Sequence, residues 1–493
     1  MFEALELGRK VTKEDFKEEE PGLHTALLAT QRRIMEAGIP VIIIIAGVEG
    51  AGKGGAVNLL NKWLDTRGLE THAFWDEPEA ARERPRFWRF WTALPARGQV
   101  GIMFGSWYTQ TIIDRVFDRA SDGDFERMLG RIDAFERMLI DDGALIVKFW
   151  LHLSKDDQQK RLARDVKEKR MTSPHLKEFA DHYDDFIKVC ERAIRATDSG
   201  YAPWNMVEAR NRRFRDLTIG RALLSAMERR LAWEESTDSG SQGPAATGGV
   251  HTPVDTVTVL DQVDLSARLE REAYESRLEK YQRRLNQLAW QAHKQNRNTV
   301  LVFEGWDAAG KGGAIRRVTA AVDARLFRVI SVAAPTDEEL AHHYLWRFWR
   351  HIPRAGYFTI YDRSWYGRVL VERVEGFAAE HEWLRAYQEI NDFEAQLADH
   401  GVVVCKFWLH ISPEEQLRRF KEREKTPWKQ HKITDEDWRN RDRMDDYRIA
   451  INDMVTRTST ASAPWTLVPA NDKYFARVQV LKTICKNLEL ALD

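Results

Sequence analysis

Gly47-Val-Glu-Gly-Ala-Gly-Lys-Gly-Gly55 and Gly305-Trp-Asp-Ala-Ala-Gly-Lys-Gly-Gly313 are two versions of one glycine-rich segment, 258 residues apart (305 − 47 = 258). Each follows a short apolar run, Val41–Ile45 in the first case and Thr299–Phe303 in the second. A strand, a Gly-x-x-x-x-Gly-Lys loop and a helix form a phosphate-binding loop, because loop amides and the helix N-terminus cradle phosphate oxygens while the lysine adds a positive charge. The sequence therefore predicts two phosphate-binding loops.

The repeat extends well beyond these loops. The same offset aligns three further pairs of segments: Trp88–Trp91 with Trp346–Trp349, Ser106–Tyr108 with Ser364–Tyr366, and Lys148–His152 with Lys406–His410. After a short length difference the offset becomes 261, and Ala202–Trp204 matches Ala463–Trp465. Matched spacing over this length indicates a tandem duplication.

Both copies share a pattern typical of α/β domains. A second apolar run, 144–147 in the first copy and 402–405 in the second, continues into Lys-Phe-Trp-Leu-His. Runs that are apolar on both faces and alternate with helices indicate a mainly parallel sheet between helices. We therefore predict two tandem P-loop kinase-like domains, residues 1–235 and 257–493, joined by a Gly/Ser/Pro-rich linker over 236–256 that has too little apolar surface to order itself.

The composition restricts the class of protein. The chain has 493 residues, 43% hydrophobic and 31% charged, which suits two globular domains with their own cores. A net charge of −1 provides no overall positive field, so we expect no nucleic-acid binding, and any polyanion must meet a local basic patch. Three unclustered cysteines, Cys190, Cys405 and Cys485, favour a reducing cytoplasm. The longest apolar run, Val41–Ala46, is too short to cross a membrane, and no membrane anchoring is expected.

The second copy carries candidate catalytic groups. Lys311 is followed by Gly312, whereas nucleotide-hydrolysing loops place a Ser or Thr there to hold Mg²⁺. Another ligand must hold the metal, and Asp307 in the loop and Asp362 after the apolar stretch 357–361 are the candidates, since Mg²⁺ prefers one or two carboxylates with waters and phosphate oxygens.

Arginines follow Asp362 in the segment Asp-Arg-Ser-Trp-Tyr-Gly-Arg. Arg363 and Arg368 supply guanidinium groups that can neutralise charge on a transferring phosphoryl group, and Glu372 and Arg373 are second-tier candidates. A purely structural Asp–Arg pair is the alternative interpretation.

The first copy differs where this chemistry would occur. At the aligned positions it has Glu49, Phe104, Gly105, Thr109 and Gln110 in place of Asp307, Asp362, Arg363, Gly367 and Arg368. A phenyl ring cannot bind Mg²⁺. We predict that the first copy retains a phosphate-binding lysine, Lys53, but is catalytically inactive.

A basic segment follows the last apolar run of the second copy. It contains Arg419, Lys421, Arg423, Lys425 and Lys429, and Pro427 is expected to end the helix. Such a run is commonly a solvated helix face. Its position also suits a helical lid whose cations close over phosphates and exclude water.

Taken together, these motifs resemble the family 2 polyphosphate kinases. The resemblance rests on the second loop, on Ala334–Glu339, on Tyr361–Arg368 with Val371–Phe377, and on Lys425–Lys429. The tandem duplication resembles the two-domain subclass, the polyphosphate:AMP phosphotransferases, in which inorganic polyphosphate is the donor and AMP becomes ADP. The resemblance implies a P-loop α/β fold with a helical lid and site residues Asp307, Lys311, Asp362, Arg363 and Arg368, with Gly305, Gly310, Gly312 and Gly313 shaping the loop.

Other functions remain open at this stage. An ATP-dependent nucleotide or small-molecule kinase, a polyphosphate-dependent enzyme acting on ADP or GDP, and a non-catalytic polyphosphate-binding protein all fit the loop motif. The first copy is expected to serve as a structural partner or as an accessory site. The sequence is also compatible with a homo-oligomer.

Overall fold

The computed structural model describes residues 1–74, 77–167, 181–238, 258–427 and 433–492. The chain forms two compact units: Met1–Glu77 with Phe90–Thr247 and Leu340–His343, and Pro78–Arg89 with Gly248–Glu339 and Tyr344–Asp493. Each unit therefore takes most of its residues from one copy of the repeat and a short segment from the other. We call the chain up to α10 (Arg212–Asp238) the first half and the chain from α11 (Arg271–Lys294) the second half. The predicted linker begins inside α10, and its residues beyond 238 lie outside the described part.

The first half contains a five-stranded parallel sheet in the order β2-β3-β1-β4-β5. Its strands are β1 (Val41–Gly47), β2 (Leu69–Ala73), β3 (Val100–Phe104), β4 (Leu145–His152) and β5 (Trp204–Glu208). The helices that accompany them are η1 (Phe2–Leu5), α1 (Lys13–Glu36), α2 (Lys53–Trp63), η2 (Thr66–Gly68), α3 (Glu79–Arg82), α4 (Trp88–Trp91), α5 (Trp107–Val116), α6 (Asp122–Asp141), α7 (Lys155–Lys167), α9 (Tyr183–Thr197) and α10.

The second half repeats this sheet in the order β7-β8-β6-β9-β10, again with every pair parallel. Its strands are β6 (Thr299–Gly305), β7 (Phe327–Ser331), β8 (Phe358–Asp362), β9 (Val403–His410) and β10 (Trp465–Pro469). Its helices are α11, α12 (Lys311–Thr319), α13 (Asp337–Leu340), α14 (Trp346–Trp349), η3 (Trp365–Val369), α15 (Val371–Val374), α16 (Glu380–Asp399), α17 (Pro413–Lys425), α18 (Asp435–Asp442), α19 (Met444–Thr458) and α20 (Lys473–Leu492).

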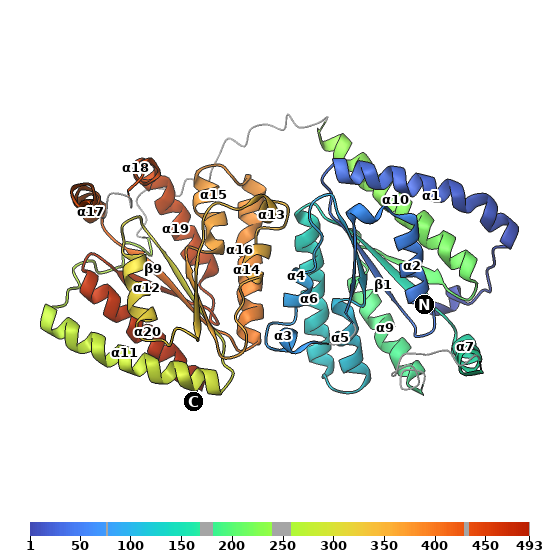
Figure 1. The fold of residues 1–493 in the computed structure, drawn as a ribbon, viewed down its shortest axis with the longest axis horizontal. Coiled ribbons are helices and arrows are strands. Elements are labelled where there is room, and N and C mark those ends of the chain that lie inside the picture. Colours follow the sequence, from blue (N-terminus) through green and yellow to red (C-terminus); the bar gives the residue numbers. More distant parts are fainter. Residues whose placement is uncertain (75–76, 168–180, 239–257, 428–432, 493) are drawn as a thin grey trace. The chain divides into compact units, whose positions relative to one another are not determined.

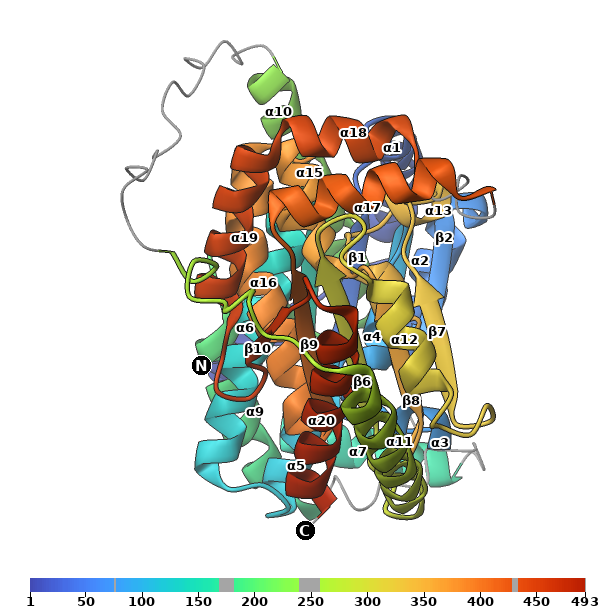
Figure 2. The same ribbon diagram turned by 90° about the vertical axis from the view of Figure 1, so that its left-hand side faces the viewer.

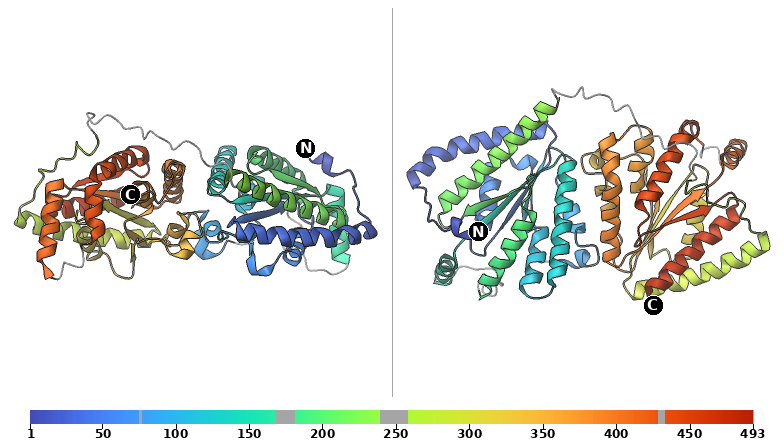
Figure 3. Two further views of the ribbon diagram at one scale, coloured as in Figure 1. Left: turned by 90° about the horizontal axis from the view of Figure 1, so that it is seen from above. Right: turned by 180° about the vertical axis from the view of Figure 1, so that it is seen from behind.

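Long helices flank each sheet. In the first half α1 and α10 lie side by side, and in the second half α11 and α20 do the same, as the front view and the view from behind both show (Figure 1 and Figure 3). Leu285 and Leu288 of α11 are buried with Leu481 and Leu488 of α20, which explains the apolar spacing in the stretch 265–293. Helices α17 and α18 lie across one end of the second half (Figure 2). The predicted α/β fold is confirmed in both halves.

The predicted strands are confirmed because their sequences suit a sheet that is covered on both faces. Residues 41–45 of β1 and 299–304 of β6 are all buried, as expected for strands with helices on either side. Phe303 of β6 stands opposite Asp362 of β8 in the register. The loop that follows β6 and the segment that follows β8 therefore emerge side by side at the carboxyl edge of the sheet.

Each half has the same buried ion pair in its core. In the second half Lys406 Nζ lies 2.7 Å from Glu394 Oε2, and both side chains are fully inaccessible to solvent. Lys406 also donates to the hydroxyl of Tyr366 and the carbonyl of Thr458, each at 2.8 Å. Trp365 and Tyr366 both donate to the other oxygen of Glu394. This network pins the repeated Ser-Trp-Tyr motif to β9 and α16, so the motif is structural.

Within the described ranges, no helix combines the length and the apolar character that a membrane-crossing segment needs.

Candidate functional site

The loop after β6 adopts a conformation that its glycines permit. Gly305 has φ +151°, and a Cβ atom there would lie 2.6 Å from the carbonyl oxygen of Leu409. Gly310, with φ +111°, precedes the first residue of α12, Lys311. Ala308 also has a positive φ, +61°. The loop therefore curls tightly between β6 and α12, and the amides that begin α12 are available to an anion.

Lys311 lies folded against this loop. Its ammonium donates to the carbonyl of Gly305 at 2.7 Å and approaches the carbonyl of Trp306 at 3.5 Å. Both partners are neutral, and no carboxylate of the described residues forms an ion pair with Lys311. This is the state in which a lysine attracts a phosphate.

Asp307 is held in place by side chains of α17 and α18 and by Arg363, the residue after β8. Its Oδ1 lies 3.4 Å from the guanidinium of Arg363, and its Oδ2 accepts a 3.0 Å hydrogen bond from Asn440 of α18. Its backbone carbonyl accepts from Gln416 of α17. The loop acid is thus oriented by groups that are far away in the sequence.

Arg363 is the turning point between β8 and η3. It has φ +64°, an uncommon conformation for a residue with a side chain, and its backbone N–H donates to the carbonyl of Phe303. Strain of this kind costs about 1–3 kcal/mol and tends to occur at functional sites. Arg363 directly follows Asp362 in the chain. The turn directs its side chain toward Asp307.

A buried acid, Glu304, lies at the end of β6. Its carboxylate accepts a 2.8 Å hydrogen bond from the hydroxyl of Ser364. Burial raises the pKa of Glu304, and the positive charge of Lys311 counteracts the rise. Glu304 therefore places a carboxyl group, either protonated or ionised, close to Lys311.

These groups surround one small cavity of about 80 Å³. Among the predicted site residues, Gly305, Asp307, Lys311 and Arg363 line it, together with Gly367, which was not predicted. Its other lining residues are Glu304, Trp306, Leu370, Val371, Trp408, Gln416, Glu436, Asn440 and Tyr447. Asp362 does not line this cavity, but it ends β8 opposite Phe303 and directly precedes Arg363, so it lies at the margin.

Gly310, Gly312, Gly313, Arg368, Glu372 and Arg373 also lie outside the lining of this cavity. Arg368 pairs with Glu372 at 3.2 Å and lies over the ring of Tyr344. Arg373 pairs with Asp453 of α19 at 2.8 Å. Glu372 and Arg373 thus have structural partners in this conformation, and a role for Arg368 at the phosphate stays a prediction.

The predicted lid residues separate into different groups. Helix α17 ends at Lys425, as expected from Pro427. Lys421 and Lys425 are exposed on it, whereas Arg423 lines a second cavity. Lys429 lies outside the described residues.

Arg419 differs from the expectation of a mobile lid cation. Its side chain is only 3% exposed, and its guanidinium donates to the carbonyls of Ala308 and Ala309 in the loop and of Ala470 and Asn471 after β10. Its Nε donates to Glu415 at 2.6 Å. The reason is geometric: Arg419 faces inward from α17, where only a planar group with five donors can satisfy so many carbonyls. Arg419 therefore clamps the loop from below.

Replacing this clamp should test its effect on the loop. We expect Arg419→Lys to lower phosphoryl-transfer activity by about 10- to 100-fold, because an ammonium has three donors and cannot hold both carbonyl pairs, and small displacements at a reacting centre have effects of this size. The measurement is the initial rate with saturating substrates. Arg418→Lys is the matched control, since Arg418 is exposed and pairs with Glu415 and Glu422 of its own helix. Equal effects of the two substitutions would contradict the clamp.

A second cavity, of about 200 Å³, lies on the other side of the loop. Ala308, Ala309 and Gly310 contribute to it, together with the cations Arg419, Arg423, Lys473 and Arg477. Burial and the neighbouring Arg419 lower the pKa of Lys473. The loop therefore separates a cavity with acids and Lys311 from a cavity whose charged lining residues are four cations and one acid, Glu422.

Sequence reasoning missed several of these residues. Glu304 could have been noticed as an acid that ends an apolar strand. No motif in the sequence marks four others, which belong to helices far from the loop in the chain and have ordinary polar neighbours in the sequence: Asn440, Tyr447, Lys473 and Arg477. Only the fold brings them to the loop.

The matching site of the first half lacks most of these charges. Lys53 is paired with Glu49 at 2.6 Å, and Phe104 and Gly105 end the strand where Asp362 and Arg363 stand in the second half. Arg161 donates to the carbonyl of Gly50 and thus repeats the clamp made by Arg419. The loop architecture is retained with an acid, Glu49, at the position of Asp307, whereas uncharged residues replace Asp362, Arg363 and Arg368.

The donor set in the second half suits a hard divalent cation. Asp362 ends β8, Asp307 follows the neighbouring strand β6, and, against the effect of burial, the negative charge of both carboxylates raises the pKa of Arg363. The described residues contain no cluster of three or more potential metal ligands. Two carboxylates completed by water and phosphate oxygens are the arrangement that such a cation commonly takes in phosphoryl-transfer sites.

Comparisons with known proteins agree with this geometry. The family described as Polyphosphate kinase 2 (PPK2) matches residues 10–234 and again residues 268–492. The polyphosphate:AMP phosphotransferase of Pseudomonas aeruginosa is 49% identical over 495 residues, which cover 100% of this chain and 99% of that protein. The protein of the same name from Acinetobacter johnsonii is 38% identical and covers 92% of both chains. A crystal structure from P. aeruginosa, assigned to polyphosphate kinase 2, superimposes with a TM-score of 0.89 at 48% identity and covers 100% of this chain and 99% of that one.

Proposed function

Because the chain belongs to the polyphosphate kinase 2 family, we propose that it transfers a phosphoryl group from inorganic polyphosphate to AMP and so forms ADP. The proposal rests on the loop of the second half. Lys311 contacts only neutral carbonyls on one face of this loop, and a cavity to which four cations contribute lies against the other. Relatives that match 92% to 100% of the chain bear the name of this activity.

In this proposal the two cavities hold the two substrates. The polyphosphate chain lies along Arg423, Lys473 and Arg477 and places its terminal phosphoryl group at the loop amides and Lys311. The phosphate group of AMP enters the cavity beside Asp307 and Arg363 and points toward the loop. The loop lies between the two cavities, and the phosphoryl group passes over it from polyphosphate to AMP.

The reaction itself needs positioning more than proton transfer. An oxygen of the AMP phosphate attacks the terminal phosphorus, the anhydride bond to the next phosphate breaks, and polyphosphate leaves one unit shorter. The attacking oxygen is already anionic at neutral pH, so no strong general base is required. Lys311, Arg363 and the loop amides stabilise the charge that spreads over the transferring group.

Asp307 and Asp362 are the residues that would hold Mg²⁺. When bound, Mg²⁺ supplies charge neutralisation at the phosphate oxygens. Arg363 and Asn440 orient the Asp307 carboxylate by contacts with its two oxygens. A cytoplasmic location, expected from the cysteines, stays a prediction, and all three cysteines are buried free thiols.

The test is a donor and acceptor screen with the full chain. Purified protein is given AMP with either polyphosphate or ATP as the sole donor, and ADP formation is followed. We expect turnover with polyphosphate. Turnover with ATP alone would replace this proposal by an ATP-dependent kinase, and preference for ADP or GDP as acceptor would place the enzyme in another branch of the family.

Asp362→Ala distinguishes an enzyme from a polyphosphate-binding protein. Loss of this acid should lower the rate by roughly 10²–10³-fold, the size seen when one electrostatic group of a preorganised site is removed. Polyphosphate binding, measured by calorimetry, should change little. Asp323→Ala is the control, since Asp323 pairs with Arg325 at the surface. Unchanged turnover in Asp362→Ala would show that the site has been assigned wrongly.

A further inference from the structure

The first half has a large cavity at the position of the vanished catalytic site. Its volume is about 400 Å³, compared with about 80 Å³ for the matching cavity of the second half. Gly47, Glu49 and Lys53 of the first loop line it together with Phe104 and Gly105 at the end of β3. A volume of this size lies within the range of small-molecule sites.

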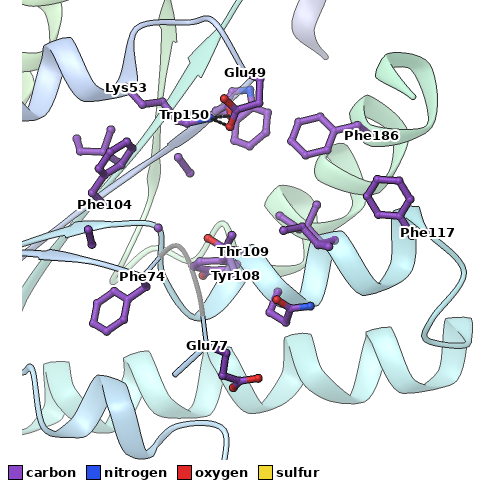
Figure 4. A pocket seen from close by; sticks show the side chains of 18 of the residues that line it. Glu49, Lys53, Phe74, Glu77, Phe104, Tyr108, Thr109, Phe117, Trp150 and Phe186 are labelled. Atoms are coloured by element: carbon purple, nitrogen blue, oxygen red, sulfur yellow. Dashed lines mark hydrogen bonds and ion pairs between the residues drawn. The ribbon is translucent and has the colours of Figure 1, made fainter. Parts of the chain in front are cut away.

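Apolar residues replace charged and polar ones around this cavity. In the repeat register, the first half has Ala46, Phe104, Gly105, Phe117 and Phe186 where the second half has Glu304, Asp362, Arg363, Glu375 and Tyr447. Phe74 and Trp150 complete an aromatic lining. Figure 4 shows Phe104 on one side of the space and Phe117 and Phe186 on the other, with Glu49 and Lys53 between them at the upper edge.

The remaining lysine is already neutralised. Lys53 Nζ lies 2.6 Å from Glu49 Oε1 and donates to the carbonyl of Gly47 at 2.9 Å. Glutamate is one methylene longer than Asp307 at the matching position and reaches its own loop lysine. A phosphate in this cavity would face the Glu49 carboxylate and would find neither Arg363 nor Arg368 at the matching positions, which Gly105 and Gln110 occupy. The charged lining residues, Lys53 and Arg119 against Glu49 and Glu77, balance one another, so the cavity offers an anion no net positive charge.

One buried donor in the lining has no acceptor. The side chain of Trp150 is only 2% exposed, and its indole N–H has no hydrogen-bond partner among the described residues. The ring stacks near Phe186, with centroids 6.1 Å apart and an interplanar angle of 27°. A buried donor without an acceptor is costly, so a ligand that supplies an acceptor at the Trp150 ring gains both stacking and a hydrogen bond.

We propose that this cavity binds an uncharged, planar heteroaromatic molecule of nucleoside size, with no phosphate group. A ring nitrogen accepts from Trp150, the ring system packs among Phe104, Phe117 and Phe186, and a hydroxyl group donates to the second oxygen of Glu49. Degeneration of the catalytic groups has thus converted a phosphate site into a site for a neutral aromatic ligand. The proposal depends on the first half alone and is independent of the reaction proposed for the second.

The experiment titrates the full chain with adenosine and, separately, with AMP by isothermal titration calorimetry. Ile113→Trp fills the cavity of the first half, and Val371→Trp makes the matching change in the second half. We expect a component of adenosine binding that Ile113→Trp weakens at least about tenfold and that Val371→Trp leaves unchanged. AMP should bind this component no more tightly than adenosine.

A second variant guards against misfolding of the first. Trp150→Phe keeps the aromatic ring and removes only the donor, and should weaken adenosine binding by about 3- to 10-fold, the range of one lost neutral hydrogen bond. Circular dichroism and thermal unfolding confirm that each variant is folded. Absence of adenosine binding in the native chain, adenosine binding that is insensitive to Ile113→Trp, or tighter Lys53-dependent binding of AMP would each overturn the proposal.

Discussion

Replacing Lys311 by alanine is expected to lower phosphoryl transfer to AMP by roughly 10³-fold, the scale for loss of a preorganised charge at a reacting group. Lys311 donates to the carbonyls of Gly305 and Trp306 and lines the cavity that holds Asp307 and Arg363. Its positive charge is therefore available to the transferring phosphoryl group. The measurement is the initial rate of ADP formation from AMP and polyphosphate.

The duplicated chain offers a matched control, Lys53→Ala. Lys53 stands at the same position of the first loop but is paired with Glu49, and Phe104 and Gly105 replace its acidic and arginine partners. We expect this variant to retain nearly full activity. A strong loss in Lys53→Ala together with activity in Lys311→Ala would mean that the catalytic half has been misassigned.

The largest expected effect on stability comes from Lys406→Met. Lys406 and Glu394 are both fully buried and lie 2.7 Å apart. Burial lowers the pKa of Lys406 and raises that of Glu394, so each depends on the other to stay charged. Removal of one partner from a buried pair leaves an uncompensated charge and costs about 3–5 kcal/mol of unfolding free energy.

Urea denaturation of the full chain, followed by tryptophan fluorescence and fitted with one transition per half, measures this cost. The double variant Lys406→Met with Glu394→Gln should lose less than the single one, because a neutral amide can still accept from Trp365 and Tyr366. Lys148→Met should act similarly on the first half, where Lys148 lies 2.7 Å from Glu136. A loss below about 1 kcal/mol would show that water or a proton compensates the remaining acid.

The fold was predictable to a large extent because its determinants are local. The apolar runs at 41–45 and 299–303 became β1 and β6, and the glycines that follow them took the positive φ values that the loop requires. Because the sequence is duplicated, each strand predicted in one half also predicts the matching strand in the other half. The order of the strands followed no local signal, since neighbouring strands in the sheet are separated by helices in the chain.

The site was predictable only in part. Asp307, Lys311 and Arg363 were expected together and line one cavity. Arg419 was expected in a lid but clamps the loop, since a periodic pattern of cations does not reveal which of them faces inward. Glu304, Asn440 and Lys473 were missed, because their roles depend on packing between elements that are remote in the sequence.

The sequence by itself determined that a phosphate-binding loop occurs twice and that only the second copy retains its acids and arginines, because loop chemistry depends on residue types at fixed local spacing. Only the tertiary structure decided which side chains surround the first loop and what kind of cavity they form. The ion pair between Glu49 and Lys53 and the aromatic lining contributed by Phe117, Trp150 and Phe186 depend on side chains that separate helices and strands bring together. Spacing along the chain does not show which side chains of remote elements lie next to one another in the folded protein.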